Sequence, residues 1–115
     1  MIVCSFTTLF LLKAKSFGHF ELVEGNVLNT LPKYLEDNPA TRLALLHLDM
    51  DVKEPTDLAL ELLYDRVVPG GLVVLDDYNS VAGETISVDE FARERGLKIE
   101  KLPFYTTPAF IRKPV

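Results

Sequence analysis

The sequence predicts an α/β fold in which a mostly parallel sheet ends in an antiparallel hairpin at its C-terminal edge. Short apolar runs alternate with helical patterns, and the runs at 43–48 and 72–75 are continuous and lead directly into aspartates. Continuous apolar runs are typical of strands buried on both faces, and strands that alternate with helices form parallel sheets. The last two runs are separated by a short connection, which favours an antiparallel pair. We therefore expect a sheet covered by helices on both faces.

Size and charge restrict the possible classes of protein. The 115 residues are 48% hydrophobic and 25% charged, enough for a single domain over residues 1–115 with a packed core. The formal net charge of -5 argues against binding nucleic acid by phosphate neutralisation. The single cysteine, Cys4, excludes an internal disulfide and fits a cytoplasmic protein. No apolar run reaches the roughly 20 residues that a membrane span requires.

The apolar segment at 2–12 is the first element along the chain. We expect it to be a core element, a helix whose last turn holds Lys13 and Lys15 and whose end is marked by Gly18. β-Branched residues near its start weaken the helical pattern. The alternative is a secretory signal peptide, which the small residues at 14 and 16 favour and the absence of a preceding basic region disfavours.

The remaining elements follow from local patterns of apolar, capping and turn-forming residues. These patterns predict strands at 20–24, closed by Gly25, and at 43–48, 72–75, 97–102 and 109–112. They predict a first helix at 29–36, capped by Asn29 or Thr30 and stopped at 37–39, and a second that opens at 54–56 and is terminated by 69–71. A third helix is predicted at about 87–94 and is stopped by Gly96.

Acidic residues follow both central strands, and they are the strongest candidates for a site. Asp49, Asp51, Asp76 and Asp77 would meet at one edge of the sheet, where open α/β sheets bind ligands. Four neighbouring carboxylates repel one another unless a cation compensates, and Mg²⁺ prefers such oxygen ligands. A carboxylate outside the metal shell could then act as a general base. The alternative is that these aspartates are ordinary caps and loop residues, and the residues alone leave the two interpretations balanced.

Other polar residues have simpler interpretations. His47 lies within an apolar run, which favours a hydrogen-bonded core histidine over a metal ligand. Tyr78 and Asn79 follow the second acid pair and could be site residues or loop anchors.

Several segments together resemble one known family. They are 46–51 (LHLDMD), 54–56 (EPT) and 69–78 (PGGLVVLDDY), supported by 21–26, 88–91 and 110–113. In this order they resemble the TylF/MycF family of macrolide sugar O-methyltransferases, which have the Rossmann-like class I methyltransferase fold, use S-adenosylmethionine and require Mg²⁺. The resemblance extends from about residue 20 to the end of the sequence.

The resemblance implies a role for each candidate residue. Asp49, Asp76 and Asp77 would be the metal ligands, and Asp51 would be the base that takes the proton from the acceptor hydroxyl. Gly25, Asn26 and Asp49 would contact S-adenosylmethionine. The acceptor would be a small molecule with a free hydroxyl, such as a sugar.

The sequence departs from the family pattern at its beginning. A glycine-rich loop would normally hold the cofactor after the first strand, and no Gly-x-Gly occurs in the sequence. The resemblance therefore starts at the family's third strand, and we expect a truncated domain that lacks the first two strands. Without them, the strand at 20–24 needs a new neighbour, so we expect a rearranged sheet or a dimer, with 9–12 helping to cover the gap.

Three functions remain open from the sequence. The first is a Mg²⁺-dependent O-methyltransferase, including a truncated or inactive member of the family. The second is a non-catalytic metal-binding or interaction module of the same ancestry. The third, from a different class, is a receiver-like signalling domain, because receivers also place acid pairs after buried strands.

Overall fold

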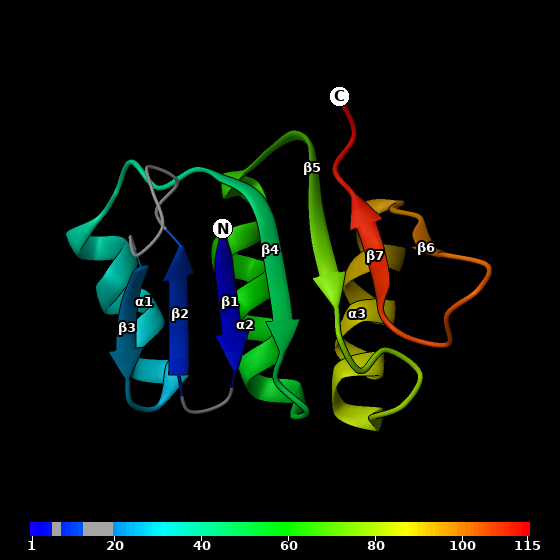
Figure 1. The fold of residues 1–115 in the computed structure, drawn as a ribbon, viewed down its shortest axis with the longest axis horizontal. Helices are drawn as coiled ribbons and strands as arrows, with labels where there is room; N and C mark the ends of the chain where they lie inside the picture. The colour runs from blue at the N-terminus through cyan, green and yellow to red at the C-terminus, as the bar shows by residue number, and fades with distance from the viewer. Residues whose placement is uncertain (6–7, 13–19) are drawn as a thin grey trace.

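The computed structural model describes residues 1–5, 8–12 and 20–115 and shows one seven-stranded sheet with its helices (Figure 1). The strands are β1 (Ile2–Ser5), β2 (Thr8–Leu12), β3 (Phe20–Glu24), β4 (Leu43–Asp49), β5 (Val67–Leu75), β6 (Ile99–Lys101) and β7 (Ala109–Arg112). The helices are α1 (Val27–Asp37), α2 (Lys53–Leu63) and α3 (Ala82–Arg95), with a 3-10 turn, η1 (Tyr64–Arg66), after α2.

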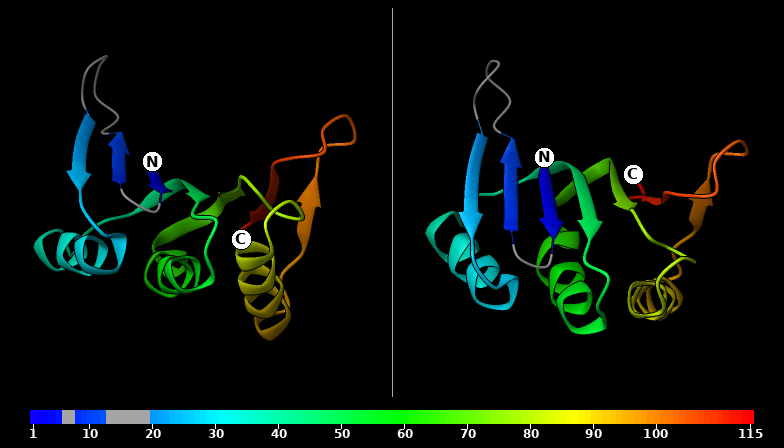
Figure 2. Two further views of the ribbon diagram at one scale, coloured as in Figure 1. Left: turned by 90° about the horizontal axis from the view of Figure 1, so that it is seen from below. Right: turned by 60° about the horizontal axis from the view of Figure 1, so that its bottom comes forward.

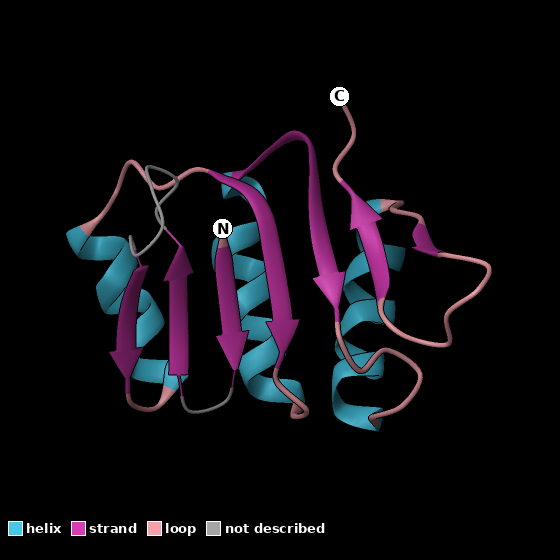
Figure 3. Cartoon of the chain, in the orientation of Figure 1, coloured by secondary structure: helices cyan, strands magenta, loops and turns pink. Residues whose placement is uncertain are grey.

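The strand order in the sheet is β3-β2-β1-β4-β5-β7-β6 (Figure 3). β1, β4 and β5 are parallel, whereas β2 is antiparallel to both of its neighbours and β7 is antiparallel to β5 and β6. Five of the seven strands therefore run in one direction, and the sheet is mixed. The antiparallel pair β6–β7 at the C-terminal edge confirms the expected hairpin.

The N-terminal segment is the largest difference from the sequence-based expectation. Instead of a helix, residues 2–12 contribute β1 and β2, which lie between β3 and β4. The predicted helix end at 13–18 lies outside the described residues. β1 pairs in parallel with β4, and β2 pairs with β3 from Thr8 to Leu12. The two sheet positions expected to be missing are therefore filled, which confirms a rearranged sheet and the expected role of 9–12.

The three helices in the described part of the chain all lie on one face of the sheet (Figure 2). The expectation of helices on both faces is therefore wrong for these residues. The core forms between this face and the helices, and its fully buried members include Leu46, Leu48, Leu63, Val73 and Ile111. On the opposite face, Leu72, Val74, Leu102, Pro108, Phe110 and Arg112 line a shallow apolar groove of about 310 Å³.

The 69–71 segment was expected to terminate the preceding helix, but it lies inside β5. The pairing of β4 with β5 shifts in register between Leu43 and Leu45, which accommodates the additional residues of β5. Gly70 adopts φ +80, and a Cβ on Gly71 would lie 3.0 Å from the Ala44 carbonyl. α2 accordingly ends earlier, at Leu63.

The other boundaries agree more closely with the sequence patterns. α1 begins three residues earlier than its predicted caps allow, because Asn26 accepts a hydrogen bond from the Leu28 N–H at 3.0 Å. α3 begins at Ala82, about five residues before the predicted start, so part of the predicted loop is helical. It ends at Arg95, and Gly96, with φ +63, is its C-cap, as expected. Within the described ranges, no helix combines the length and apolar character needed to cross a membrane.

Candidate metal centre and acidic rim

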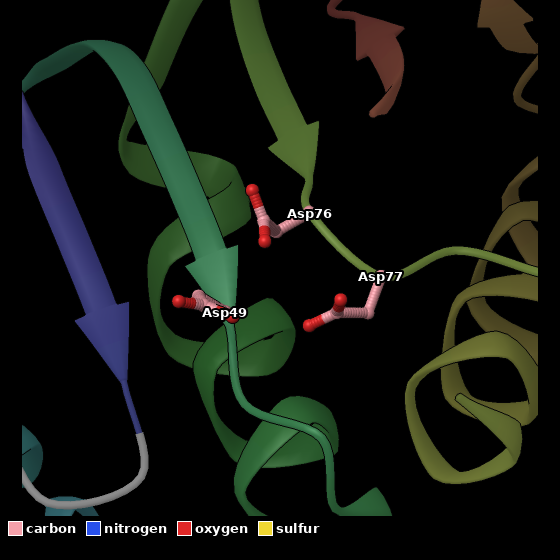
Figure 4. Close-up of side chains that lie close together, drawn as sticks. All are labelled: Asp49, Asp76 and Asp77. Carbon is pink, nitrogen blue, oxygen red and sulfur yellow. The ribbon is translucent and has the colours of Figure 1, made fainter. Parts of the chain in front are cut away.

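The ends of β4 and β5 bring three aspartates together. Asp49 is the last residue of β4, and Asp76 and Asp77 follow β5, whose Leu75 pairs with Leu48. One carboxylate oxygen from each aspartate lies within 4.8 Å of the others. In Figure 4, Asp76 and Asp77 point from the end of β5 toward β4. The three side chains are only partly buried, so a ligand can reach them from solvent.

Asp51 lies on the tight turn that follows β4 and completes the expected group of four acids. Its backbone adopts φ +62, and the Val52 N–H donates to the Met50 carbonyl at 2.7 Å. The pKa of Asp51 is raised, chiefly because its carboxyl group can share a proton with that of Asp77. A carboxylate with a raised pKa accepts a proton more readily than an ordinary surface aspartate.

The pKa of Asp77 is also raised. Hydrogen bonding with Asp51 lowers this pKa, but burial and the carboxylates of Asp49 and Asp76 outweigh that contribution. The negative charges thus disfavour full ionisation of the cluster unless a proton or a cation is shared among them.

Glu84 is a further acidic residue near the site that the sequence patterns did not identify. It lies in the first turn of α3 and is fully buried, with an exposed fraction of 0%. Its Oε1 accepts the Asp77 N–H at 3.2 Å, whereas its Oε2 has no hydrogen-bond partner among the described residues. Burial raises the pKa of Glu84 to about 7, although the backbone N–H groups of Asp77 and Met50 oppose this shift. Acidic residues are common in exposed first turns, so the sequence carries no signal that this one is buried.

The start of α3 also packs closely against the loop after β4. A Cβ on Gly83 would lie 2.8 Å from both the Asp51 carbonyl oxygen and the Lys53 nitrogen. One turn later, the Ser87 hydroxyl donates to the Lys53 carbonyl at 3.1 Å. The N-terminal half of α3 therefore supports the loop that carries Asp51.

His47 is not the core residue that its apolar run suggested. Its Nε2 lies 3.0 Å from Oδ1 of Asp76, and its side chain is 30% exposed. The alternation along β4 places His47 on the face away from the helices, since the adjacent Leu46 and Leu48 are buried in the core. His47 is thus positioned to orient Asp76.

Tyr78 and Asn79 have structural partners in α3. The Tyr78 hydroxyl donates to Asp89 at 2.6 Å, and this carboxylate is the main reason that the pKa of Tyr78 rises to about 12. Asn79 adopts φ +70, and its N–H donates to the Thr85 hydroxyl. These contacts fit the interpretation of both residues as loop anchors.

Gly25 and Asn26 lie on the same edge of the sheet as the aspartates, but at the end of β3 (Figure 1). β2 and β1 separate them from β4, and three strand spacings amount to about 14 Å. Gly25 adopts φ +128, and the Asn26 side chain caps α1. The structure therefore does not bring these two predicted cofactor residues into contact with the acidic cluster.

The donor set of the cluster suits a hard divalent cation. Asp49, Asp76 and Asp77 offer only oxygen atoms, the ligands that Mg²⁺ prefers, and Mg²⁺ typically keeps waters that a substrate oxygen can replace. The electrostatic repulsion among these acids supplies a physical reason for binding a cation.

Solved structures with this arrangement of helices and strands are class I methyltransferases. The chain superposes on the apo structure of CalS11, a TDP-rhamnose 3'-O-methyltransferase of calicheamicin biosynthesis, with a TM-score of 0.72 and 34% identity over 78% of this chain and 40% of that one. It superposes on the O-methyltransferase NovP with a TM-score of 0.67 and 28% identity, over 80% of this chain and 36% of NovP.

A comparison of sequences identifies the family to which the chain belongs. The model of the macrocin O-methyltransferase family, TylF, matches residues 6–113, and the chain belongs to this family.

Two curated relatives are O-methyltransferases. The chain is 40% identical over 67 residues to 8-demethyl-8-(2,3-dimethoxy-alpha-L-rhamnosyl)-tetracenomycin-C 4'-O-methyltransferase of Streptomyces olivaceus, covering 55% of this chain and 25% of that protein. It is 33% identical over 81 residues to demethyldecarbamoylnovobiocin O-methyltransferase of Streptomyces niveus, covering 67% of this chain and 30% of the relative. The chain thus matches less than a third of the length of either relative.

Proposed function

We propose that this chain takes part in Mg²⁺-dependent transfer of a methyl group from S-adenosylmethionine to a hydroxyl group of a sugar or a similar small molecule. The observation that carries the proposal is the convergence of Asp49, Asp76 and Asp77, which lie within the segment matched by the family model. The similar proteins include a TDP-rhamnose 3'-O-methyltransferase, which supports a sugar hydroxyl as the acceptor.

Asp49, Asp76 and Asp77 would hold the Mg²⁺ ion. Bound Mg²⁺ would supply Lewis acidity, which lowers the pKa of an acceptor hydroxyl. Asp51 would take the proton from that hydroxyl, a role that its position beside Asp77 supports. S-adenosylmethionine, when bound, would supply an electrophilic methyl group to the acceptor oxygen.

Cofactor contact belongs to the same proposal. Asp49 lies at the end of a central strand, whereas Gly25 and Asn26 lie at the end of β3, so a ligand that touches all three must extend along the carboxyl edge of the sheet. The Asn26 side chain already caps α1, so its backbone is the part available to a ligand.

We also propose that the chain forms a homo-oligomer and functions in the cytoplasm. The sheet face opposite the helices carries a groove lined mainly by apolar side chains, and a second copy would remove this surface from water. The buried, unpaired thiol of Cys4 is compatible with a reducing compartment.

Calorimetric titrations test the metal and the cofactor separately. Mg²⁺ should bind the native chain, and Asp76→Asn should weaken that binding at least ~10-fold through loss of one carboxylate ligand. Asp65→Asn, which changes an exposed carboxylate on η1, is the matched control and should leave the affinity unchanged. S-adenosylmethionine should then bind in the presence of Mg²⁺. Absence of Mg²⁺ binding by the native chain would refute the proposed metal centre.

The second candidate function is a metal-binding interaction module of the same ancestry. The lack of a Gly-x-Gly sequence in the 115 residues favours it. Mg²⁺ binding without measurable S-adenosylmethionine binding would support this module, whereas methyl transfer to a sugar nucleotide would support the enzyme.

A further inference from the structure

Glu84 connects the two loops that carry the acidic cluster. Its carboxylate accepts the Asp77 N–H at 3.2 Å, and the Met50 N–H, from the loop after β4, also interacts favourably with it. Among the described residues, Glu84 is the only acidic residue that is buried. Glu84 thus bonds to the loop after β5, and the helix that carries it packs against the loop after β4.

The rest of α3 holds Glu84 in a fixed place. Gly83 approaches the backbone of the loop after β4 so closely that a Cβ would lie 2.8 Å from two of its atoms. Ser87 donates to the Lys53 carbonyl one turn further along. Because the carboxylate projects from a helix anchored on both sides of it, Glu84 can fix the separation between the two loops.

We propose that Glu84 is a positioning residue, which sets the spacing of Asp49 and Asp77 for a cation by accepting the Asp77 N–H while its helix, α3, packs against the loop after β4. This inference rests on the proposed function of the cluster as a Mg²⁺ site. Residues behind metal ligands typically change metal affinity 10- to 100-fold, because they hold the ligands in place. Glu84 acts here through its acceptor oxygen and through helix α3, and not as a ligand.

Two variants of similar size separate this role from the alternatives. Glu84→Gln keeps an acceptor oxygen for the Asp77 N–H but removes the charge, whereas Glu84→Met fills similar space and removes the acceptor. Glu94→Met, at an exposed position on the same helix, is the matched control. The affinity of each folded variant for Mn²⁺, used as a Mg²⁺ substitute, is measured by electron paramagnetic resonance, and circular dichroism checks the fold.

Glu84→Met should bind Mn²⁺ about 10- to 100-fold more weakly than the native chain, and Glu84→Gln should remain within about 3-fold of it. Equal affinities for all variants would overturn the proposal. An equally large loss in Glu84→Gln would also overturn it, because the charge and not the acceptor would then be responsible. If Glu84→Met does not fold, Glu84→Ala, which also removes the acceptor, is measured in its place.

A second readout does not depend on the metal. Amide hydrogen exchange at Asp77 should be faster in Glu84→Met than in the native chain and little changed in Glu84→Gln, since only the former loses the acceptor. Failure of the native chain to bind Mn²⁺ would refute the proposed metal centre, and unchanged exchange at Asp77 would refute the positioning role of Glu84.

Discussion

Replacing Glu84 by glutamine should make the stability of the protein less dependent on pH. Burial raises the pKa of this carboxyl group from 4.5 to about 7 in the folded chain. The folded state therefore holds the proton more tightly than the unfolded state does. The contribution of Glu84 to stability is most favourable below pH 4.5, falls as the pH rises toward 7, and is lost above pH 7.

The magnitude follows from the difference between the two pKa values. One pKa unit corresponds to about 1.4 kcal/mol, so ionised Glu84 costs the folded state roughly 3 kcal/mol. Glutamine does not titrate, so the free energy of unfolding of Glu84→Gln relative to the native chain should rise by roughly 3 kcal/mol between pH 4.5 and pH 8. This is a substantial part of the ~5–15 kcal/mol that stabilises a typical domain.

Urea unfolding followed by far-ultraviolet circular dichroism measures this difference. Both proteins are compared at pH 4.5 and pH 8 in the presence of a chelator, so that bound cations do not contribute. Glu94→Gln, at an exposed position on the same helix, is the control and should differ from the native chain equally at both pH values. The reasoning is refuted if the advantage of Glu84→Gln changes by less than about 0.5 kcal/mol between the two pH values, the usual scale of surface substitutions.

Three further substitutions test other parts of the structure. Asn26→Ala removes the cap of α1 and should lower the free energy of unfolding by about 1 kcal/mol, which thermal or urea unfolding can measure; no change would contradict the cap geometry. Gly83→Ala should displace the loop at Asp51, because the new Cβ would lie 2.8 Å from backbone atoms. It should lower the free energy of unfolding by more than about 1 kcal/mol and weaken Mg²⁺ binding in calorimetry. Native stability together with native Mg²⁺ affinity would count against this close approach. The Tyr78 hydroxyl donates to Asp89, which raises its pKa to about 12. Tyr78→Phe should therefore remove the tyrosine that ionises near pH 12 in an ultraviolet titration. An unaltered titration would show that this hydrogen bond is not formed in solution.

The central strands and the acidic cluster could be predicted from the sequence because their signals are local. The run at 43–48 forms β4 nearly as predicted, and the aspartates follow because the chain leaves the sheet there. Parallel strands end at the same edge, so topology alone brings Asp49 close to Asp76 and Asp77.

The N-terminal strands and the 69–71 segment could not be predicted because they depend on distant partners. The apolar run at 2–12 fits a helix or strands, and only pairing with β4 and β3 selects strands. Similarly, 69–71 has the local composition of a helix terminator, but hydrogen bonds of Gly70 and Gly71 with Lys113 near the C-terminus hold it in the sheet. Tertiary contacts override the local preference in both cases.

His47 and Glu84 were missed for a related reason. Their importance depends on what lies beside them, Asp76 in one case and the Asp77 backbone in the other. Nothing in the order of residues distinguishes a buried first-turn glutamate from an exposed one, or a histidine at the edge of a site from one in the core.

The position of β1 in the sheet has a consequence for the order of events during synthesis. Ile2 and Cys4 are made before their parallel partners, Leu46 and Leu48. At about 5–20 residues per second, the N-terminal strand waits several seconds for β4 to appear. During that interval, side chains that are buried in the finished core, Ile2 and Cys4 among them, are exposed to water. β3 reaches β4 in the sheet only through β2 and β1, so its pairing into the main sheet follows the docking of β1.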